Sequence, residues 1–352
     1  MFLAFKEIQF SKFKYILVVG LLFLIGYLVF FLSGLANGLA QANRSAIDKW
    51  HADHIVLANG VDNRIQMSHF DPQLFKEVHA HEKTAISLQS ILFDSPTDEE
   101  SLSAQLIGID KNSFLSPTIS EGRLFEKENE VVVDETFLSD HQWRIGDTLS
   151  IKNSDDQLII VGTIKGHQLS VQPVIYINRQ DFTQLESTFG SLELPLVSAI
   201  ITQGDTSITT DDLEVSPIEE FIQELPGYHA QNLTFALMIG FLVAIAAVVI
   251  SIFIYVLTLQ KESVFGILKA QGISNSYLMR SVIYQTLILA GVGVLMGAGL
   301  TYGSAYLLPN SVPFMINHLF VVVIGVAILS FALLGGLVSS RMITKIDPLE
   351  AI

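Results

Sequence analysis

Cysteine is absent from the sequence, so no disulfide bond stabilises the fold and cysteine-based catalysis is excluded. The motif G-x-x-x-x-G-K-[ST], whose backbone cradles nucleotide phosphates, is also absent, so we do not expect this chain to hydrolyse ATP. A basic patch that would bind nucleic acid is missing from a sequence of net charge −15. Charge itself is missing in places: no Asp, Glu, Lys or Arg occurs in residues 15–43, 225–260 or 281–340.

These three charge-free blocks predict four membrane-spanning helices. A bilayer core requires about 20 consecutive, mostly apolar residues per helix. The first two blocks each hold one span, and the third holds two spans divided by the turn Pro-Asn-Ser-Val-Pro at 309–313. Half of the residues are hydrophobic and the mean hydropathy is +0.48, which disfavours the alternative of a soluble protein with long buried helices.

Lys and Arg are distributed unevenly around the predicted spans. Segments 1–14, 261–280 and 341–352 together carry eight Lys or Arg and four Asp or Glu, a net charge of +4. Segment 44–224 carries twelve Lys or Arg and thirty-one Asp or Glu, a net charge of −19. Short basic segments remain on the cytoplasmic side of a membrane. We therefore expect both termini in the cytoplasm of a bacterial cell, the protein in its plasma membrane, and the acidic segment outside.

We expect an α-helical membrane protein with four transmembrane helices (1+3) and a mixed α/β extracellular domain inserted between helices 1 and 2. A cleaved signal peptide is the alternative for the first span, but its apolar run is longer than a typical signal core. The expected divisions are an amphipathic cytoplasmic helix (1–14), helix 1 with its extension (15–43), the extracellular domain (44–224), helix 2 (225–260), a cytoplasmic loop (261–280), helix 3 (281–308), helix 4 (314–340) and a cytoplasmic tail (341–352).

Short β-rich runs between turn signals predict the strands of the middle domain. We expect helices over 73–81 with Asp71 as the cap, over 180–189, and over 216–225 with a cap-like Ser216. The expected strands are 54–57, 102–109, 130–133, 148–151, 158–164, 174–177 and 197–202.

Glycines recur in the third predicted span at a spacing that lets helices approach closely. The pairs Gly293/Gly297 and Gly299/Gly303 are each four residues apart. The spacing fits helix packing within the chain or a contact between two copies of it.

The loop between helices 2 and 3 is short and amphipathic. Gly272 is a plausible C-terminal breaker of a helix in this loop, and Ser274 a cap for the next one. Its sequence KESVFGILKAQG, over residues 261–272, resembles the coupling loop of FtsX-like, MacB-type ABC transporter permeases. The ending DPLEAI at 347–352 and the stretch from Gly122 to Leu149 resemble the same family. Within the family, the N-terminal third, including YLVFFLSGLA at 27–36, is most similar to haem-exporting permeases.

The resemblance implies a permease that works with two copies of a separate ATPase subunit, which binds the ATP, and that forms a homodimer. The chain itself would not be an enzyme. ATP-driven movement inside would be transmitted to the outer domain, and an amphiphilic substrate would enter from membrane lipid, since charge-free spans do not line a polar path. The predicted ATPase-coupling residues are Lys261, Glu262, Val264, Phe265, Gly266, Leu268, Lys269 and Gly272.

For haem as the transported substrate, iron ligands and aromatic contacts are expected near the outer end of helix 2. Glu220 and Glu224 are four apart on one predicted helix, with Glu219 beside them, and acids of two copies could ligate one iron. The remaining candidates are Tyr228, His229, Phe221, Phe30 and Phe31. The alternatives are that the acids form a solvated helix face, that Tyr228 and His229 anchor the membrane interface, and that the phenylalanines face lipid. No other metal site is predicted.

Two other functions are compatible with this sequence. The first is export of another lipophilic toxin or antimicrobial peptide. The second is a non-transporting, FtsX-like regulator that activates an extracellular hydrolase. Increased sensitivity of a deletion strain to haemin is expected for haem export and for neither of these two alternatives.

Overall fold

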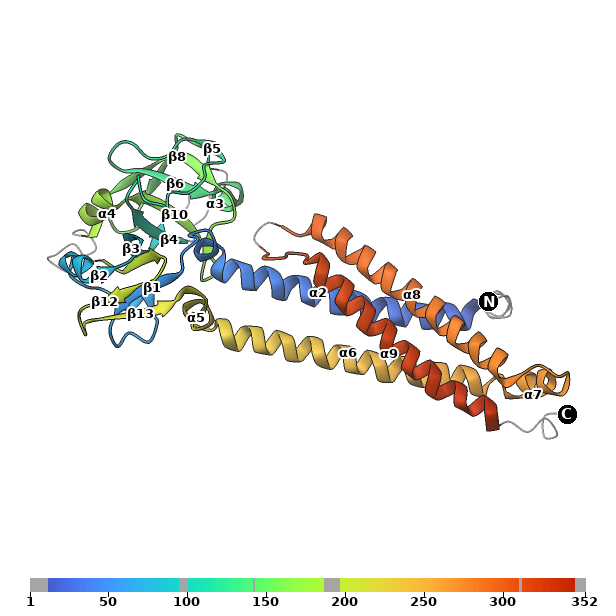
Figure 1. Ribbon diagram of the computed structural model, residues 1–352. Helices are drawn as coiled ribbons and strands as arrows, with labels where there is room; N and C mark the ends of the chain where they lie inside the picture. The colour runs from blue at the N-terminus through green and yellow to red at the C-terminus, as the bar shows by residue number, and fades with distance from the viewer. Residues whose placement is uncertain (1–11, 95–100, 142, 187–196, 310–311, 346–352) are drawn as a thin grey trace. The chain divides into compact units, whose positions relative to one another are not determined.

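The computed structural model describes residues 12–94, 101–141, 143–186, 197–309 and 312–345 (Figure 1). The chain divides into two compact units. The membrane unit comprises Met1–Gly38, Leu233–Pro309 and Phe314–Ile352, and the α/β unit comprises Leu39–Asn232 with Asn310–Pro313.

Four long helices are apolar and long enough to cross a membrane. Because an α-helix rises about 1.5 Å per residue, each exceeds the roughly 30 Å of a bilayer core. They fall where the charge-free blocks predict spans, and the protein is a membrane protein. They are α2 (Lys12–Asp48), α6 (Tyr228–Leu259), α8 (Asn275–Leu307) and α9 (His318–Lys345).

Glycines set the closest helix contacts of the membrane unit. A Cβ added to Gly293 would lie 2.6 Å from Leu22 Cβ, and one added to Gly297 would lie 2.7 Å from the Tyr27 backbone nitrogen. The first predicted glycine pair therefore packs α8 against α2 of the same chain. Gly299 and Gly303, the second pair, meet no described atom within 4 Å of an added Cβ.

The α/β unit is built on one large mixed sheet with the strand order β13-β1-β11-β3-β4-β10-β6-β8-β5, to which β7 pairs at β8 and β9 at β10. β10 runs parallel to β4 and β6 runs parallel to β8, and the other pairs are antiparallel. A separate pair joins β12 to β2. The strands are β1 (His54–Ala58), β2 (Val78–His79), β3 (Glu82–Phe93), β4 (Leu102–Ile109), β5 (Glu121–Gly122), β6 (Glu130–Asp134), β7 (Thr148–Ser150), β8 (Gln157–Ile164), β9 (Gln168–Leu169), β10 (Gln172–Asn178), β11 (Ala199–Gln203), β12 (Ser207–Ile208) and β13 (Leu213–Pro217).

Strand β3 joins the two halves of the sheet and is absent from the predicted strands. Its first five residues pair with β11 and its last seven pair with β4. A strand of 12 residues with different partners along its length carries no single alternation of apolar and polar positions, because its buried face changes.

Two of the predicted helices of this unit need correction. Segment 73–81 is not an α-helix: a 3-10 helix, η2 (Pro72–Glu77), is followed by β2. Asp71 does cap η2, since its Oδ1 accepts a hydrogen bond of 2.7 Å from the Gln73 backbone nitrogen. Val78 is fully buried and pairs with β12, which ends the helical turn.

The helix predicted over 216–225 is shorter, α5 (Ile218–Gln223), because Ser216 belongs to β13. The Ser216 hydroxyl donates to Asn63 Oδ1 at 3.0 Å and does not cap the helix.

The other helices of the α/β unit are η1 (Ile65–Met67), α3 (Glu135–His141) and α4 (Arg179–Glu186). α4 begins within one residue of the helix predicted over 180–189, whose last residues lie outside the described ones. The predicted N-terminal amphipathic helix and the ending at 347–352 also lie wholly or mostly outside them.

The C-terminal end of α2 is part of the α/β core. Ile47 and Trp50 are buried together with Phe221 and Tyr228, which come from α5 and the first turn of α6. The apolar stripe of a helix end and the segment 218–228 thus share one core, and this brings Arg44, on the same end of α2, close to the acids of α5.

Candidate functional site

The junction between α5 and α6 forms the candidate substrate site. α5 ends at Gln223, and Glu224 is its C-cap. Pro226 and Gly227 then interrupt the helical path, with Gly227 in the left-handed region at φ +79° that favours glycine. α6 starts at Tyr228, so the break places residues 223–230 around a corner.

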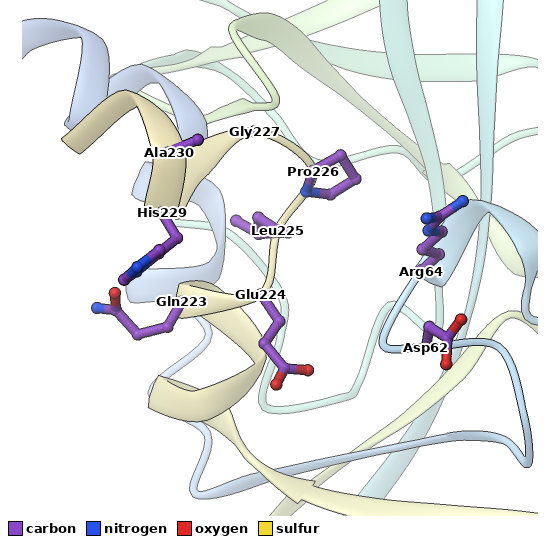
Figure 2. Close-up of a pocket in the computed structure, with 9 residues that line it drawn as sticks. All are labelled: Asp62, Arg64, Gln223, Glu224, Leu225, Pro226, Gly227, His229 and Ala230. Carbon is purple, nitrogen blue, oxygen red and sulfur yellow. The ribbon is translucent and has the colours of Figure 1, made fainter. Parts of the chain in front are cut away.

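An open pocket of about 930 Å³ lies at this corner (Figure 2). Figure 2 shows His229 and Gln223 on one side and Arg64 with Asp62, from the loop after β1, on the other, with Glu224 between them. Its volume falls in the upper part of the range of roughly 300–1,000 Å³ common for small-molecule sites. The pocket therefore offers a carboxylate, an imidazole and a guanidinium to one ligand.

Arg44 forms an ion-pair cluster beside the pocket residues. Its Nη2 lies 2.7 Å from Asp48 Oδ1 and 2.9 Å from Glu219 Oε2, and its Nη1 donates to Glu219 Oε1 at 3.1 Å. Two-point pairing of a planar guanidinium with a carboxylate fixes the orientation of both groups.

This pair changes the interpretation of Glu219. Its hydrogen bond with Arg44 holds the pKa of the Glu219 carboxyl below its usual range, so the group is anionic at neutral pH. Both of its oxygens already accept from Arg44, so iron ligation by Glu219 would require breaking that pair. Glu219 therefore orients α5 against α2 and does not line the pocket.

The other two acids differ from Glu219. Glu224 lines the pocket, and its Oε2 accepts a short hydrogen bond from Asn63 Nδ2. Glu220 is exposed, has no side-chain partner among the described residues, and does not line the pocket. The Glu224 backbone nitrogen donates to the Glu220 carbonyl oxygen at 3.1 Å, which keeps the two acids one helical turn apart, as expected. His229 is exposed at the pocket wall.

The aromatic candidates are mostly buried. Phe221 is 0% exposed and Tyr228 5% exposed in the core of the α/β unit, and Phe30 is 1% exposed in the core of the membrane unit. Phe31 is half-buried, with its ring centroid 5.1 Å from that of Phe314. Contact with a planar ligand would require movement of Phe221, Tyr228 and Phe30.

Sequence reasoning missed Arg44 with its second partner Asp48, Asn63, and the pocket residue Arg64. One local signal existed for the first two. Arg44 is the first charged residue after a charge-free block, and Asp48 follows four residues later on the same helix face. Nothing local indicated that Arg44 would meet Glu219, 175 residues away.

The second candidate region is the short helix α7 (Glu262–Ala270), between α6 and α8. Phe265 and Gly266 are buried in the membrane unit, and Leu268 packs against the same core. Glu262, Val264 and Ile267 are exposed. Of the predicted coupling residues, Phe265, Gly266 and Leu268 therefore anchor α7, and Glu262 and Val264 face outward together with Ile267, which was not among them.

Basic and capping residues hold α7 in place. Lys261 Nζ donates to Gln285 Oε1 at 3.0 Å and lies 5.6 Å from the centre of the Tyr15 ring. At the other end, Gly272 has φ +87°, its nitrogen donates to the Lys269 carbonyl, and the Ile273 nitrogen donates to the Leu268 carbonyl at 3.1 Å. This is a Schellman C-cap, and it confirms the predicted breaker at Gly272.

The predicted cap at the start of α8 is confirmed as well. Ser274 has extended backbone angles, and its hydroxyl accepts from the Tyr277 backbone nitrogen at 3.4 Å. Half-buried Lys269 lies in the last turn of α7, where a cation is favoured by the helix dipole.

Comparison with known proteins defines the class. Residues 236–348 match the FtsX-like permease C-terminal domain, so the chain carries a permease domain of the FtsX-like family. Along nearly its whole length it is similar to the curated "Putative hemin transport system permease protein HrtB" of Staphylococcus haemolyticus, with 27% identity over 99% of this chain and 98% of that protein. The protein of the same name from Staphylococcus epidermidis strain ATCC 12228 is 26% identical over the same shares.

A solved structure, the extracellular domain of the ABC-type transporter YknZ from Gram-positive bacteria, is similar with a TM-score of 0.31. It is 12% identical and covers 46% of this chain and 84% of that one.

Proposed function

We propose that this protein is the permease subunit of an ABC-type efflux transporter that moves haem from the membrane to the outside of a bacterial cell. The observation that carries the proposal is the 26–27% identity, over 99% of this chain, to permeases named for hemin transport. The FtsX-like permease domain at 236–348 supports the transporter class.

In the proposed arrangement the protein lies in the plasma membrane with both termini in the cytoplasm and the α/β unit outside. The support is the excess of Lys and Arg in segments 1–14 and 261–280 against the net charge of −19 in segment 44–224. The division into cytoplasmic, transmembrane and extracellular segments follows from this orientation.

Energy would enter at α7. A separate ATPase, in two copies and binding the ATP, would dock on the exposed residues Glu262, Val264 and Ile267. Phe265, buried in the membrane unit, would transmit the movement to α6 and α8. Two copies of the permease would form a homodimer around the transport path. Since residues 15–43, 225–260 and 281–340 carry no Asp, Glu, Lys or Arg, haem would travel from lipid and not through a polar channel.

Haem would meet the protein at the α5–α6 corner. The His229 imidazole and the Glu224 carboxylate are iron-ligand types, and Arg64 on the opposite wall suits a propionate. Glu220, exposed and without a side-chain partner among the described residues, is a further candidate ligand. Glu219, paired with Arg44, would position α5. Movement of Phe221 and Tyr228 out of the core would be needed for them to contact the porphyrin.

The site is tested with the purified full chain titrated with haemin and followed by the absorbance band of bound haem. We expect Glu224→Gln combined with His229→Ala to weaken binding at least ten-fold, and Glu220→Gln to weaken it less. Glu82→Gln, an exposed acid on β3 away from the pocket, is the matched control and should bind as wild type does. Unchanged binding by the double variant would reject this corner as the site.

Transport is tested in cells. Deletion of the gene should raise sensitivity to haemin and increase cellular haem, and the wild-type chain should restore both. Ile267→Asp should fail to restore resistance while reaching the membrane in normal amount, because it places a charge on the proposed docking face. Ser263→Ala, exposed on the same helix, is the control. A deletion strain with normal haemin sensitivity would reject haem as the substrate.

A further inference from the structure

An apolar groove runs along the membrane unit between α2 and α8. Its volume is about 470 Å³, and it extends from Lys12 to Gly20 on α2 and from Ile288 to Met296 on α8. Both stretches belong to candidate membrane spans and to the same compact unit. The groove shares no lining residue with the candidate pocket at the α5–α6 corner.

Glycine explains why the groove is open. An added Cβ on Gly20 would meet no described atom within 4 Å. Farther along α2, Gly293 and Gly297 of α8 bring the two helices into backbone contact at Leu22 and Tyr27. The helix pair is therefore tight at the contact glycines and leaves a hollow on the side toward Lys12.

The wall of the groove suits a hydrocarbon chain. Ile16, Val292 and Met296 are 65%, 42% and 50% exposed, and none of the described residues that line the groove is acidic. The α2 side covers nine residues, a rise of about 12 Å, which is less than half of the roughly 30 Å bilayer core. The groove thus fits one lipid tail within a single leaflet.

Positive charge lies at the open end of the groove. The Lys12 side chain has no hydrogen bond or ion pair among the described residues, and it is exposed. Lys14, two residues on, donates to Gln260, and Lys261 lies over the ring of Tyr15, another groove residue. Basic pockets between membrane helices bind the phosphate of anionic lipid headgroups. The positive charge therefore favours an anionic headgroup, and the apolar hollow accommodates an acyl chain.

From this juxtaposition we infer that the α2–α8 groove binds an anionic glycerophospholipid, with one acyl chain beside Gly20 and the phosphate at Lys12. The bound lipid fills the space that the glycine leaves and neutralises the cation at the end of the span. This site is distinct from transport of haem and does not depend on it.

The test uses the full chain in nanodiscs that contain phosphatidylglycerol or phosphatidylcholine, each carrying a photoreactive group on its acyl chain. Crosslinked lipid per chain is counted by mass spectrometry. Wild type should capture phosphatidylglycerol at least five-fold more than phosphatidylcholine, with the crosslinks at 16–20 and 288–296. Gly20→Leu should lose most of this capture because its side chain occupies the hollow.

Lys12→Gln, at an exposed position that leaves the packing intact, should reduce the preference for phosphatidylglycerol to less than two-fold. Gly240→Leu is the matched control: it lies on α6 with open space around its added Cβ, does not line the groove, and should leave capture unchanged. Equal capture of the two lipids by wild type, an unchanged preference in Lys12→Gln, or full capture by Gly20→Leu would each overturn the inference. If the protein does not export haem but gives the expected lipid capture, the lipid site is supported and only the proposed transport function is rejected.

Discussion

A buried carboxylate of the α/β unit and two buried hydroxyls of the membrane unit find their hydrogen-bond partners by different means. In the α/β unit, the nearly buried Glu130 accepts from both Arg123 terminal nitrogens, at 2.6 Å and 2.5 Å, and from two backbone nitrogens. In the membrane unit, the hydroxyls of Thr286 and Thr301 donate to backbone carbonyls four residues earlier, at 2.9 Å each. Glu130 is thus satisfied by a charge pair and backbone donors, whereas Thr286 and Thr301 are satisfied within their own helix.

Close packing at glycine occurs in both units: in the α/β unit, an added Cβ on Gly162 would lie 2.4 Å from the Arg123 carbonyl oxygen. An added Cβ on Gly335 of α9 would lie 2.9 Å from Ser251 Cα of α6, and the Gly297 contact with α2 is equally close. Without water to drive apolar association, membrane helices depend on close backbone packing. We conclude that the membrane unit is sensitive to side-chain size at the glycines where its helices meet, and that the α/β unit is also sensitive to removal of the charge partner of Glu130.

Among the variants that test this comparison, Gly297→Leu is expected to cause the largest loss of stability. Its Cβ would lie 2.7 Å from the Tyr27 nitrogen and 3.0 Å from the Gly26 carbonyl carbon, which are backbone atoms and cannot rotate away. We expect destabilisation of about 3 kcal/mol or more, measured as a lower midpoint of thermal unfolding in detergent.

Gly299→Leu is the matched control, two residues along α8 with open space around its Cβ. The unfolding midpoint of this control should stay near that of wild type. Equal loss in both variants would show that glycine content, and not the α2 contact, stabilises the unit.

The next effect concerns Glu130→Gln in the α/β unit. Pairing with Arg123 lowers the pKa of Glu130 from 4.5 to about 2. Because the folded-state pKa is depressed, the stabilisation is present above about pH 4.5 and is lost as the pH falls toward 2. At neutral pH the substitution should cost about 2 kcal/mol, since Arg123 and two backbone donors lose a charged acceptor.

The measurement is the thermal midpoint of the α/β unit within the full chain, recorded from pH 7 to pH 3. Wild type should lose stability on acidification more steeply than Glu130→Gln, and Glu82→Gln, exposed on β3, should follow wild type. Parallel pH curves for wild type and Glu130→Gln would show that this ion pair does not set the acid sensitivity.

The sequence predicts the two units unequally, for a physical reason. The spans follow from composition alone, because a bilayer core tolerates no charged stretch, and the caps Gly272 and Ser274 follow from local backbone chemistry. Neither rule depends on distant residues. The α/β unit, by contrast, contains β3, whose two halves pair with strands at 102–108 and 199–203.

The candidate site, too, could be predicted only where it does not depend on residues far apart in the sequence. The acids beside the corner were candidates from the sequence, whereas the corner at Pro226 and Gly227 was not predicted, and the role of Glu219 depends on Arg44 at the end of α2. Three acids within six residues were equal candidates from the sequence, yet their environments differ: Glu219 pairs with Arg44, Glu220 is exposed, and Glu224 lines the pocket. The three-dimensional structure is needed to distinguish Glu219, which positions α5, from Glu220 and Glu224, which are candidate ligands.

The smallest expected effect concerns the C-cap of α7 and tests whether local backbone conformation fixes the end of this helix. Gly272 has φ +87°, where an added Cβ strains the backbone although no atom lies within 4 Å of it. Gly272→Ala should cost about 1–2 kcal/mol, seen as a lower unfolding midpoint and faster amide exchange at Ile273, whose nitrogen completes the cap. Ser263→Ala, at an exposed position of the same helix, should change neither. Unchanged exchange in Gly272→Ala would mean that burial of Phe265, and not the Schellman cap, fixes the end of α7.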